Sequence, residues 1–357
     1  MKKNVLAILK KVLASSFAMI LAICSFAGCN GNGQCASCSN ELAKGEQEVC
    51  NTCATGNKEV LNGKKIIFIG NSYTYYGQTV LEKNQSILDQ ESRSNDEGYF
   101  YQLCKANGVD VNVTNWTFGG HGAIRDLFSG NCVADRGCNG VDHASYLIDR
   151  NYDYVVIQAG PDRSAEDAYL TEMNKIMDFF KAGNAETKFI VSVPYCCYGV
   201  GTSNTLMAGC LNALKTLAEQ GVIISDWGGL VADILNKKVQ VPNTAFEYTN
   251  TTFIVAKGIN DGYHPNLMSG YITTLMTYCA ITGATAQAKT YDFCNDSSLN
   301  AKFAEPEWFS FQAFKSKYYM FGKTNFIDVF SSTSEMKGIQ KLVDEHLTAK
   351  AYMNYNY

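Results

Sequence analysis

Three side chains in two short stretches have the types and the spacing needed for nucleophilic hydrolysis. Ser72 follows the first strongly apolar run, and Asp261 and His264 lie three residues apart far downstream. An imidazole can take the proton of a serine hydroxyl, and a carboxylate can hold the ring in the tautomer that this transfer needs. Gly262 makes a turn between the carboxylate and the ring easy. The pattern therefore predicts a triad of Ser72, His264 and Asp261.

Few other residues compete for the role of general base, because the chain has only four histidines. They are His121, His143, His264 and His346. We expect His121 in a loop beside the site, and His143 and His346 at the protein surface.

The elements that would position these residues alternate along the chain. Short apolar runs predict strands at residues 64–69, 109–116, 154–158, 188–193 and 222–225. Periodic segments predict helices at residues 80–92, 165–181, 205–220, 266–282 and 335–347. This alternation predicts a parallel sheet covered on both faces. Right-handed crossovers would then bring the loops that follow the strands, including the one with Ser72, to a single edge.

The motifs around these residues resemble those of the SGNH (GDSL-like) hydrolases. Residues 67–73 resemble the first block, in the variant with Asn71 where Asp is usual before the serine. Residues 115–120 resemble the second block, and residues 261–265 match the last. The resemblance covers residues 64–285. It implies an α/β fold, a flavodoxin-like three-layer α/β/α sandwich with a parallel, roughly five-stranded sheet, and a serine esterase that needs no cofactor for catalysis.

The resemblance also implies an oxyanion hole, in which the backbone N–H groups of Ser72 and Gly120 would donate. The third block normally reads Gly-x-Asn-Asp, whereas the third strand here ends in the sequence Gln-Ala-Gly-Pro-Asp at residues 158–162. Some relatives with the Gly-Asn-Ser start carry Gln at the strand end, so the amide of Gln158 is expected to replace that of Asn. The residues expected to contact substrate are Asn71, His121 and Asp162, and a solvated turn is an equally good interpretation of Asp162.

Each motif also has an ordinary structural interpretation. A Gly-Asn-Ser after a strand is often a turn into a helix cap, and an Asp-Gly-Tyr-His sequence is often a polar surface loop. Their order along the chain, with the glycine pair at residues 119–120 between them, favours the catalytic interpretation.

Residues 1–28 have the features of an export signal. Lysines precede an apolar stretch at residues 12–26, and small residues come directly before Cys29. This cysteine resembles the lipidated residue of a bacterial lipoprotein, although Phe26 stands where Leu is usual. An ordinary cleaved signal and an uncleaved membrane anchor are the alternatives. We expect an exported, extracytoplasmic protein that is anchored to the cell membrane by a lipid on Cys29.

Residues 29–63 form a tether rich in Cys, Gly and Asn. Its two C-x-x-C pairs have the spacing of a zinc ribbon and would form a closed structural site with four thiolates. These cysteines are Cys35, Cys38, Cys50 and Cys53. In an exported chain two disulfides are the alternative.

The hydrolase domain is expected at residues 64–290, followed by a C-terminal extension at residues 291–357 that packs on it.

The composition narrows the classes of function. Hydrophobic residues at 46% and aromatic residues at 12% are too frequent for a disordered chain, and a net charge of −4 gives no basic surface for nucleic acid.

We expect a small ester or an acylated glycan as substrate, with acetyl as the acyl group, because a tethered exported hydrolase meets polysaccharide. The alternatives are a lipase or peptidoglycan deacylase, a non-catalytic glycan- or ligand-binding lipoprotein on the same fold, and a redox or metal-handling lipoprotein that acts through its C-x-x-C pairs.

Overall fold

A sheet of five parallel strands forms the centre of the protein. The computed structural model describes residues 56–75, 77, 79–80, 98–117, 127, 143–158, 165–200, 207–242, 244, 247–254, 264–287 and 333–354. The strands in these ranges are β1 (Lys64–Gly70), β2 (Val111–Thr117), β3 (Tyr154–Gln158), β4 (Lys188–Ser192) and β5 (Ile223–Ser225). Their order is β2-β1-β3-β4-β5, and every pairing between them is parallel. The predicted parallel sheet is therefore confirmed.

This strand order is the flavodoxin-like one, in which the direction of winding reverses between β1 and β3. β1 pairs with β2 along its whole length, and its residues from Ile66 to Ile69 also pair with β3. The last five residues of β1 and all five of β3 are buried, as expected of strands that are covered on both faces. The ends of β1 and β3 therefore border the crevice in which sheets of this type bind their ligands.

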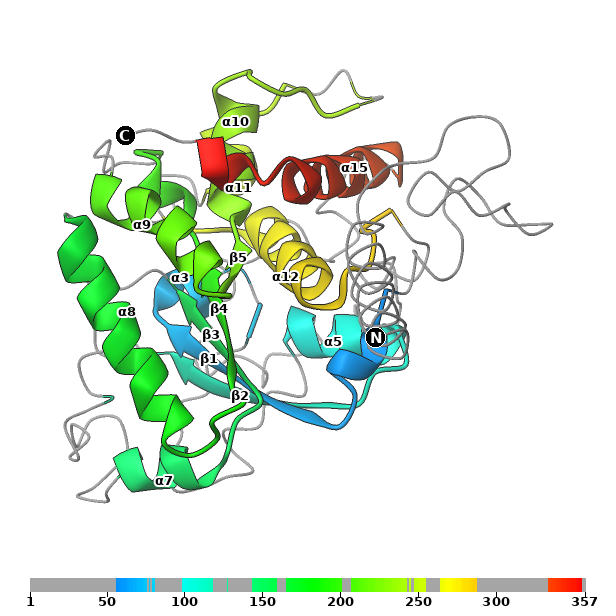
Figure 1. The fold of residues 1–357 in the computed structure, drawn as a ribbon. Helices are drawn as coiled ribbons and strands as arrows, with labels where there is room; N and C mark the ends of the chain where they lie inside the picture. The colour runs from blue at the N-terminus through cyan, green and yellow to red at the C-terminus, as the bar shows by residue number, and fades with distance from the viewer. Residues whose placement is uncertain are drawn as a thin grey trace, which may run out of the picture.

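Helices cover both faces of the sheet, which confirms the predicted three-layer sandwich (Figure 1). The longer helices are α5 (Tyr99–Ala106), α8 (Glu166–Lys181), α9 (Ala208–Glu219), α10 (Trp227–Leu235), α12 (Leu267–Thr282) and α15 (Thr333–Ala349). The shorter ones are η1 (Lys58–Val60), α3 (Ser72–Tyr75), α7 (His143–Asp149), η4 (Tyr195–Cys197), α11 (Asn250–Phe253) and η9 (Ala351–Asn354). In the described part of the chain, no helix combines the length and the apolar character that crossing a bilayer requires.

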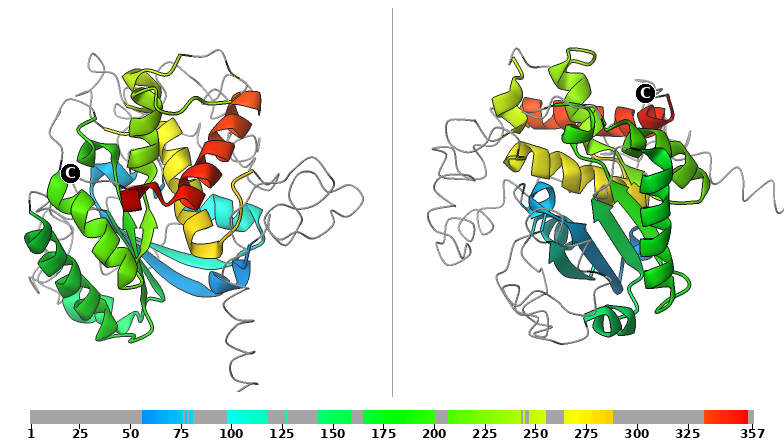
Figure 2. Two further views of the ribbon diagram at one scale, coloured as in Figure 1. Left: turned by 45° about the horizontal axis from the view of Figure 1, so that its top comes forward. Right: turned by 90° about the vertical axis from the view of Figure 1, so that its left-hand side faces the viewer.

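The helix α12 is the most extensively buried of the long helices that the structure describes. With α5 it covers one face of the sheet, while α8 and α9 cover the other (Figure 1). The helices α10 and α15 pack against α12 in turn, and Figure 2 shows α15 lying across it. Every residue of α12 from Leu267 to Cys279 is consequently buried.

The helices α5, α7 and α10 were not predicted from the sequence. The first two have 8 and 7 residues, too few for a clear helical period. The third begins with Trp227-Gly228-Gly229, and glycine disfavours helices. It starts nevertheless because the Asp226 carboxylate accepts the backbone N–H of Gly229 at 3.1 Å. The helix predicted at residues 80–92 lies, beyond Val80, outside the described residues.

Polar contacts fasten α15 to the helices beneath it. The Gln340 amide donates to the Tyr271 hydroxyl in α12 at 2.9 Å, and His346 Nε2 lies 3.0 Å from Asp226 Oδ2 at the start of α10. The expected surface position of His346 is wrong: the residue is 7% exposed, because the buried Asp226 carboxylate gives its side chain a partner inside the fold. The apolar residues of α15 that join the core are Met336, Ile339, Leu342 and Val343.

Asp344 holds the segment that follows α12 against α15. Its carboxylate accepts the backbone N–H of Ala286 at 2.6 Å and that of Gln287 at 3.2 Å, and it also bonds the side chains of Thr285 and Gln287. Burial raises the pKa of the Asp344 carboxyl, and these donors oppose the rise.

The packed part of the chain begins before β1. Leu61 is fully buried, and the backbone N–H of Asn57 donates to the Thr282 carbonyl at the end of α12 at 2.8 Å. Residues 57–61, at the end of the segment expected to be a tether, thus pack on the domain.

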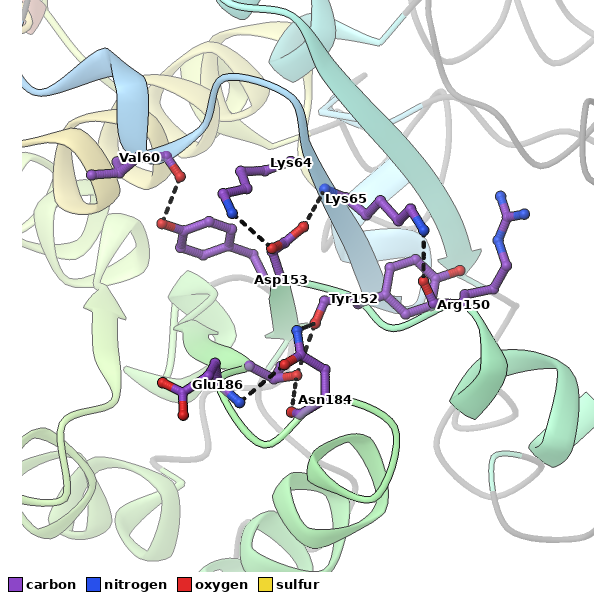
Figure 3. A network of polar contacts seen from close by, with 10 residues as sticks. Val60, Lys64, Lys65, Arg150, Tyr152, Asp153, Asn184 and Glu186 are labelled. Carbon is purple, nitrogen blue, oxygen red and sulfur yellow. Dashed lines mark hydrogen bonds and ion pairs between the residues drawn. The ribbon is translucent and has the colours of Figure 1, made fainter.

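A polar network joins β1 to β3 at the amino edge of the sheet (Figure 3). The Asp153 carboxylate accepts from Lys64 Nζ at 3.0 Å and from the backbone N–H of Lys65 at 2.9 Å. The Tyr154 hydroxyl donates to the Val60 carbonyl at 2.9 Å. These contacts fix the strands at the edge opposite to that of Ser72.

The role of Asp344 predicts a large loss of stability for Asp344→Ala. The backbone N–H groups of Ala286 and Gln287 would lose a buried acceptor, so we expect the free energy of unfolding to fall by about 2–4 kcal/mol in urea titrations. Glu345→Ala is the matched control, since this neighbouring carboxylate is exposed and pairs only at 3.7 Å with Lys341. It should change the same quantity by less than about 0.5 kcal/mol. Equal effects of the two substitutions would contradict the assigned role.

Candidate active site

The structure brings Ser72 and His264 into hydrogen-bond contact. The Ser72 Oγ atom lies 2.6 Å from His264 Nε2, although 192 residues separate the two along the chain. The His264 side chain is 7% exposed, while Ser72 is only partly buried. A hydroxyl that an imidazole nitrogen contacts directly and that a ligand can still reach has the arrangement that nucleophilic catalysis requires.

The turn after β1 places Ser72 at the first position of α3. The side-chain oxygen of Asn71 accepts the backbone N–H of Tyr73 at 3.0 Å, and its carbonyl accepts that of Thr74 at 2.8 Å. Asn71 therefore caps the short helix. Its expected contact with substrate remains a prediction.

His264 is fixed by the start of α12. Asn266 caps this helix, because its side-chain oxygen accepts the backbone N–H of Met268 at 3.0 Å, while its amide donates to the Thr252 carbonyl at 2.8 Å. The first turn of α12 also touches the chain that follows α3: a Cβ atom on Gly270 would lie 1.5 Å from the Gly77 carbonyl oxygen. Only glycine permits this approach, which keeps the imidazole close to the Ser72 turn.

Aromatic rings support the imidazole from the side of β4. The Tyr73 ring centroid lies 5.8 Å from that of His264 and 5.7 Å from that of Tyr195 in η4. Tyr195 in turn packs edge-on against Trp227 at 5.4 Å, and the indole N–H donates to the Ser192 hydroxyl. This series of rings connects His264 with the ends of β4 and β5.

Gln158 lies at the end of β3, beside the Ser72 turn, and is 4% exposed. Its side-chain oxygen accepts two hydrogen bonds, from the backbone N–H of Asn71 at 3.1 Å and from the Thr74 hydroxyl at 2.7 Å. Within the described residues the Nε2 group of Gln158 has no hydrogen-bond partner. Its two hydrogens are therefore available to an acceptor supplied by a ligand.

Several predicted site residues lie outside the described residues. They are Asp261, Gly120, His121 and Asp162 of the expected active site, and Cys29, Cys35, Cys38, Cys50 and Cys53 of the expected lipid and zinc sites. Their roles remain predictions. Across the part of the chain that the structure describes, no three His, Cys, Asp or Glu side chains gather as a metal site would need.

Sequence reasoning missed Thr74 and Tyr195. A threonine at the beginning of a helix is too common to be noticed, and its contact with Gln158 depends on the neighbouring strand, 84 residues away. A weak signal for Tyr195 exists, because it comes directly after the Pro194 that ends the fourth apolar run.

Comparisons with known proteins give distant likenesses of fold. The chain matches no family model and no curated protein in sequence. A DUF4886 family protein from Bacteroides uniformis is 15% identical with a TM-score of 0.44, over 79% of this chain and 94% of the other. A protein described as a GDSL-like lipase from Parabacteroides merdae is 15% identical with a TM-score of 0.40, over 62% and 97%. An acetyl xylan esterase from Geobacillus stearothermophilus is 16% identical with a TM-score of 0.38, over 63% and 97%. At these sequence identities and TM-scores, the chemistry of this protein has to be inferred from its own side chains.

The packing of Tyr73 predicts that its ring keeps the imidazole aligned with Ser72. Modification of Ser72 by a fluorophosphonate probe, followed by intact-protein mass spectrometry, measures this alignment. Tyr73→Leu should slow the modification by about 10-fold or more, because small displacements of a reacting group are costly, whereas Tyr73→Phe should stay within about twofold. Tyr146→Leu, a half-buried tyrosine in α7 at the other edge of the sheet, is the control and should react like the wild type. Equal rates for the two leucine variants would exclude this role.

Proposed function

We propose that this protein is a serine esterase of the SGNH (GDSL-like) type. The observation that carries the proposal is the 2.6 Å contact between Ser72 Oγ and His264 Nε2. It lies where β1 ends beside β3, at the point where the winding of the sheet reverses, which is the usual position of ligands in such folds. The sequence motifs around both residues, and their order in the chain, support the same assignment.

The proposed reaction passes through an acyl-enzyme. His264 Nε2 takes the hydroxyl proton as Ser72 Oγ bonds to the ester carbonyl carbon, and the carbonyl oxygen becomes an oxyanion. When the bond to the alkoxy oxygen breaks, the imidazolium donates its proton to the departing alcohol. A water molecule then attacks the acyl-enzyme, His264 takes its proton, and the acid leaves as that proton returns to Ser72. One water is consumed for each ester, and Asp261 is proposed to orient the ring throughout.

The proposed oxyanion hole consists of the Gln158 amide and the backbone N–H groups of Ser72 and Gly120. The orientation of Gln158 supports its part in this proposal, because its oxygen is held by two donors and its nitrogen is left for the substrate. A preorganised donor at this position stabilises charge that develops only in the transition state.

The proposed substrate is an acylated glycan or a small ester, with acetyl as the acyl group. The support is the sequence of residues 1–28, which has the features expected of an export signal. Together with the proposed lipid on Cys29, such a signal would hold the enzyme at the outer side of the cell membrane, near polysaccharide. The four cysteines of the tether are proposed to have a structural role, either as ligands of a zinc ion or as two disulfides. Four thiolates would close the coordination of a zinc ion and leave no position for catalysis.

A second candidate is a binding module without turnover. One observation favours it: Pro161 stands where the third block of the resembling family has its oxyanion Asn. Such a module would keep the crevice and bind a glycan or another ligand without cleaving it, so a wild type that is inert towards esters would support this alternative.

Hydrolysis of p-nitrophenyl acetate tests the proposed triad. Ser72→Ala and His264→Ala should each lower kcat by about 10⁴-fold or more, and Asp261→Asn should lower it no more than His264→Ala, because the imidazole moves the proton and the carboxylate orients it. His143→Ala, at the start of α7 at the opposite edge of the sheet, should retain wild-type kinetics. Wild-type turnover by His264→Ala is incompatible with the mechanism.

The proposed role of Gln158 predicts an effect on the chemical step. Gln158→Ala should lower kcat by about 10²–10³-fold and change KM by less than about threefold, because the donor acts on the transition state. The control is Gln220→Ala, an exposed amide at the end of α9. A kcat for Gln158→Ala that matches the control would remove Gln158 from the oxyanion hole while leaving the triad intact.

A further inference from the structure

The side-chain amide of Gln158 has two ends of nearly the same shape and opposite hydrogen-bonding character. Turned one way it presents an N–H₂ group to a ligand, and turned the other way it presents a carbonyl oxygen. The first orientation stabilises an oxyanion, whereas the second repels it. An amide that serves as an oxyanion donor therefore needs neighbours that fix its orientation and its position.

Two donors beside Gln158 meet this need. The backbone N–H of Asn71 can only donate, so its 3.1 Å contact favours the oxygen of the amide at that place over the nitrogen. The Thr74 hydroxyl makes the shorter contact, 2.7 Å to the same oxygen. The first contact selects which end of the amide faces inward, and the second holds the side chain in place.

The surroundings make these contacts strong and specific. Thr74 and Gln158 are 7% and 4% exposed, so water competes little for the hydrogen bond between their side chains. A Cβ atom on Gly70 would lie 2.5 Å from Thr74 Oγ1 and 2.8 Å from Gln158 Oε1. The arrangement therefore fits only against a residue without a side chain, and any larger residue would displace the hydroxyl or the amide.

Thr74 and Ser72 belong to the same turn of α3. The turn that presents the nucleophile thus also holds the side chain of the oxyanion donor from the neighbouring strand. The hydrogen bond from Thr74 thus ties the position of the Gln158 amide to the helix that carries Ser72.

We propose that Thr74 is a positioning residue for the reaction, and that its hydroxyl, together with the backbone N–H of Asn71, holds the Gln158 amide with the N–H₂ group towards the substrate oxygen. This inference rests on the proposed esterase function and on the donor role of Gln158. It adds a residue that touches neither the substrate nor the triad.

Kinetics of Thr74→Val and Thr74→Ser on p-nitrophenyl acetate test the inference. Valine keeps the shape and removes the donor, so kcat should fall about 10–100-fold while KM changes by less than about threefold. Serine keeps the hydroxyl and should remain within about threefold of the wild-type kcat. Thr171→Val, on the exposed face of α8, is the control and should leave kcat unchanged. Circular dichroism verifies folding, and Thr74→Ala replaces the valine variant if valine prevents folding.

A double-mutant cycle separates positioning from general damage to the fold. In the Gln158→Ala background the amide is absent, so Thr74→Val should lower kcat by less than about twofold. An equal reduction in both backgrounds would show that Thr74 acts by another route and would overturn the inference. A wild-type kcat for Thr74→Val would also overturn it.

A wrong proposal of esterase function and a wrong role for Thr74 give different experimental results. If the wild type neither hydrolyses esters nor reacts with a fluorophosphonate at Ser72, the proposed function falls, and the inference falls with it. If the wild type and Gln158→Ala have equal kcat while Ser72→Ala is inactive, the triad stands and the role of Thr74 is overturned.

Discussion

The pairing of β1 with a strand on each side constrains where Ser72 can lie. From Ile66 to Ile69 the strand is bonded to β2 and to β3, and its side chains are buried on both faces. A strand held in this way cannot change register without turning its apolar residues and displacing its neighbours. The turn at residues 70–72 therefore leaves the sheet at a fixed point, directly beside the end of β3. The hydrogen bonds from Asn71 and Thr74 to Gln158 extend this constraint from the backbone to the side chains of the site.

The imidazole depends on a second constraint, the enclosure of α12. A helix that is buried on nearly all sides needs cover on its outer face, and α10 and α15 provide that cover. The cap by Asn266 and the close contact of Gly270 with Gly77 then set how its first turn meets the Ser72 turn. The position of His264 thus depends on a C-terminal helix that begins about 70 residues further along the chain. Packing transmits position over this distance because close-packed interiors deform little.

The amino-acid sequence was sufficient to predict the positions of the strands and of the long helices. The five strands and the helices α8, α9, α12 and α15 were predicted with boundaries near those observed. The strands are apolar runs, α8, α9 and α15 are amphipathic, and α12 is a long segment whose start is marked by Pro265 and Asn266. The motif residues Ser72 and His264 were paired from type and order alone. The helix α10 was missed because Gly228 and Gly229 disfavour a helix locally, and its start depends on the Asp226 cap. The contact of Thr74 with Gln158 and the burial of His346 depend on residues distant in sequence, which a local pattern does not contain.

The two edges of the sheet hold different groups of interactions: the candidate active site lies at one edge, and a polar network that joins the strands lies at the other. At the amino edge, Asp153 binds Lys64 and the backbone of Lys65, and Tyr154 binds the carbonyl of Val60 (Figure 3). These bonds join strands at the end remote from Ser72 and use none of its neighbours. Changes in the loops after β3 or β4 would therefore leave these bonds between the strands untouched. Ligand preference and thermal stability would then depend on different edges of the sheet and could change independently of one another during evolution.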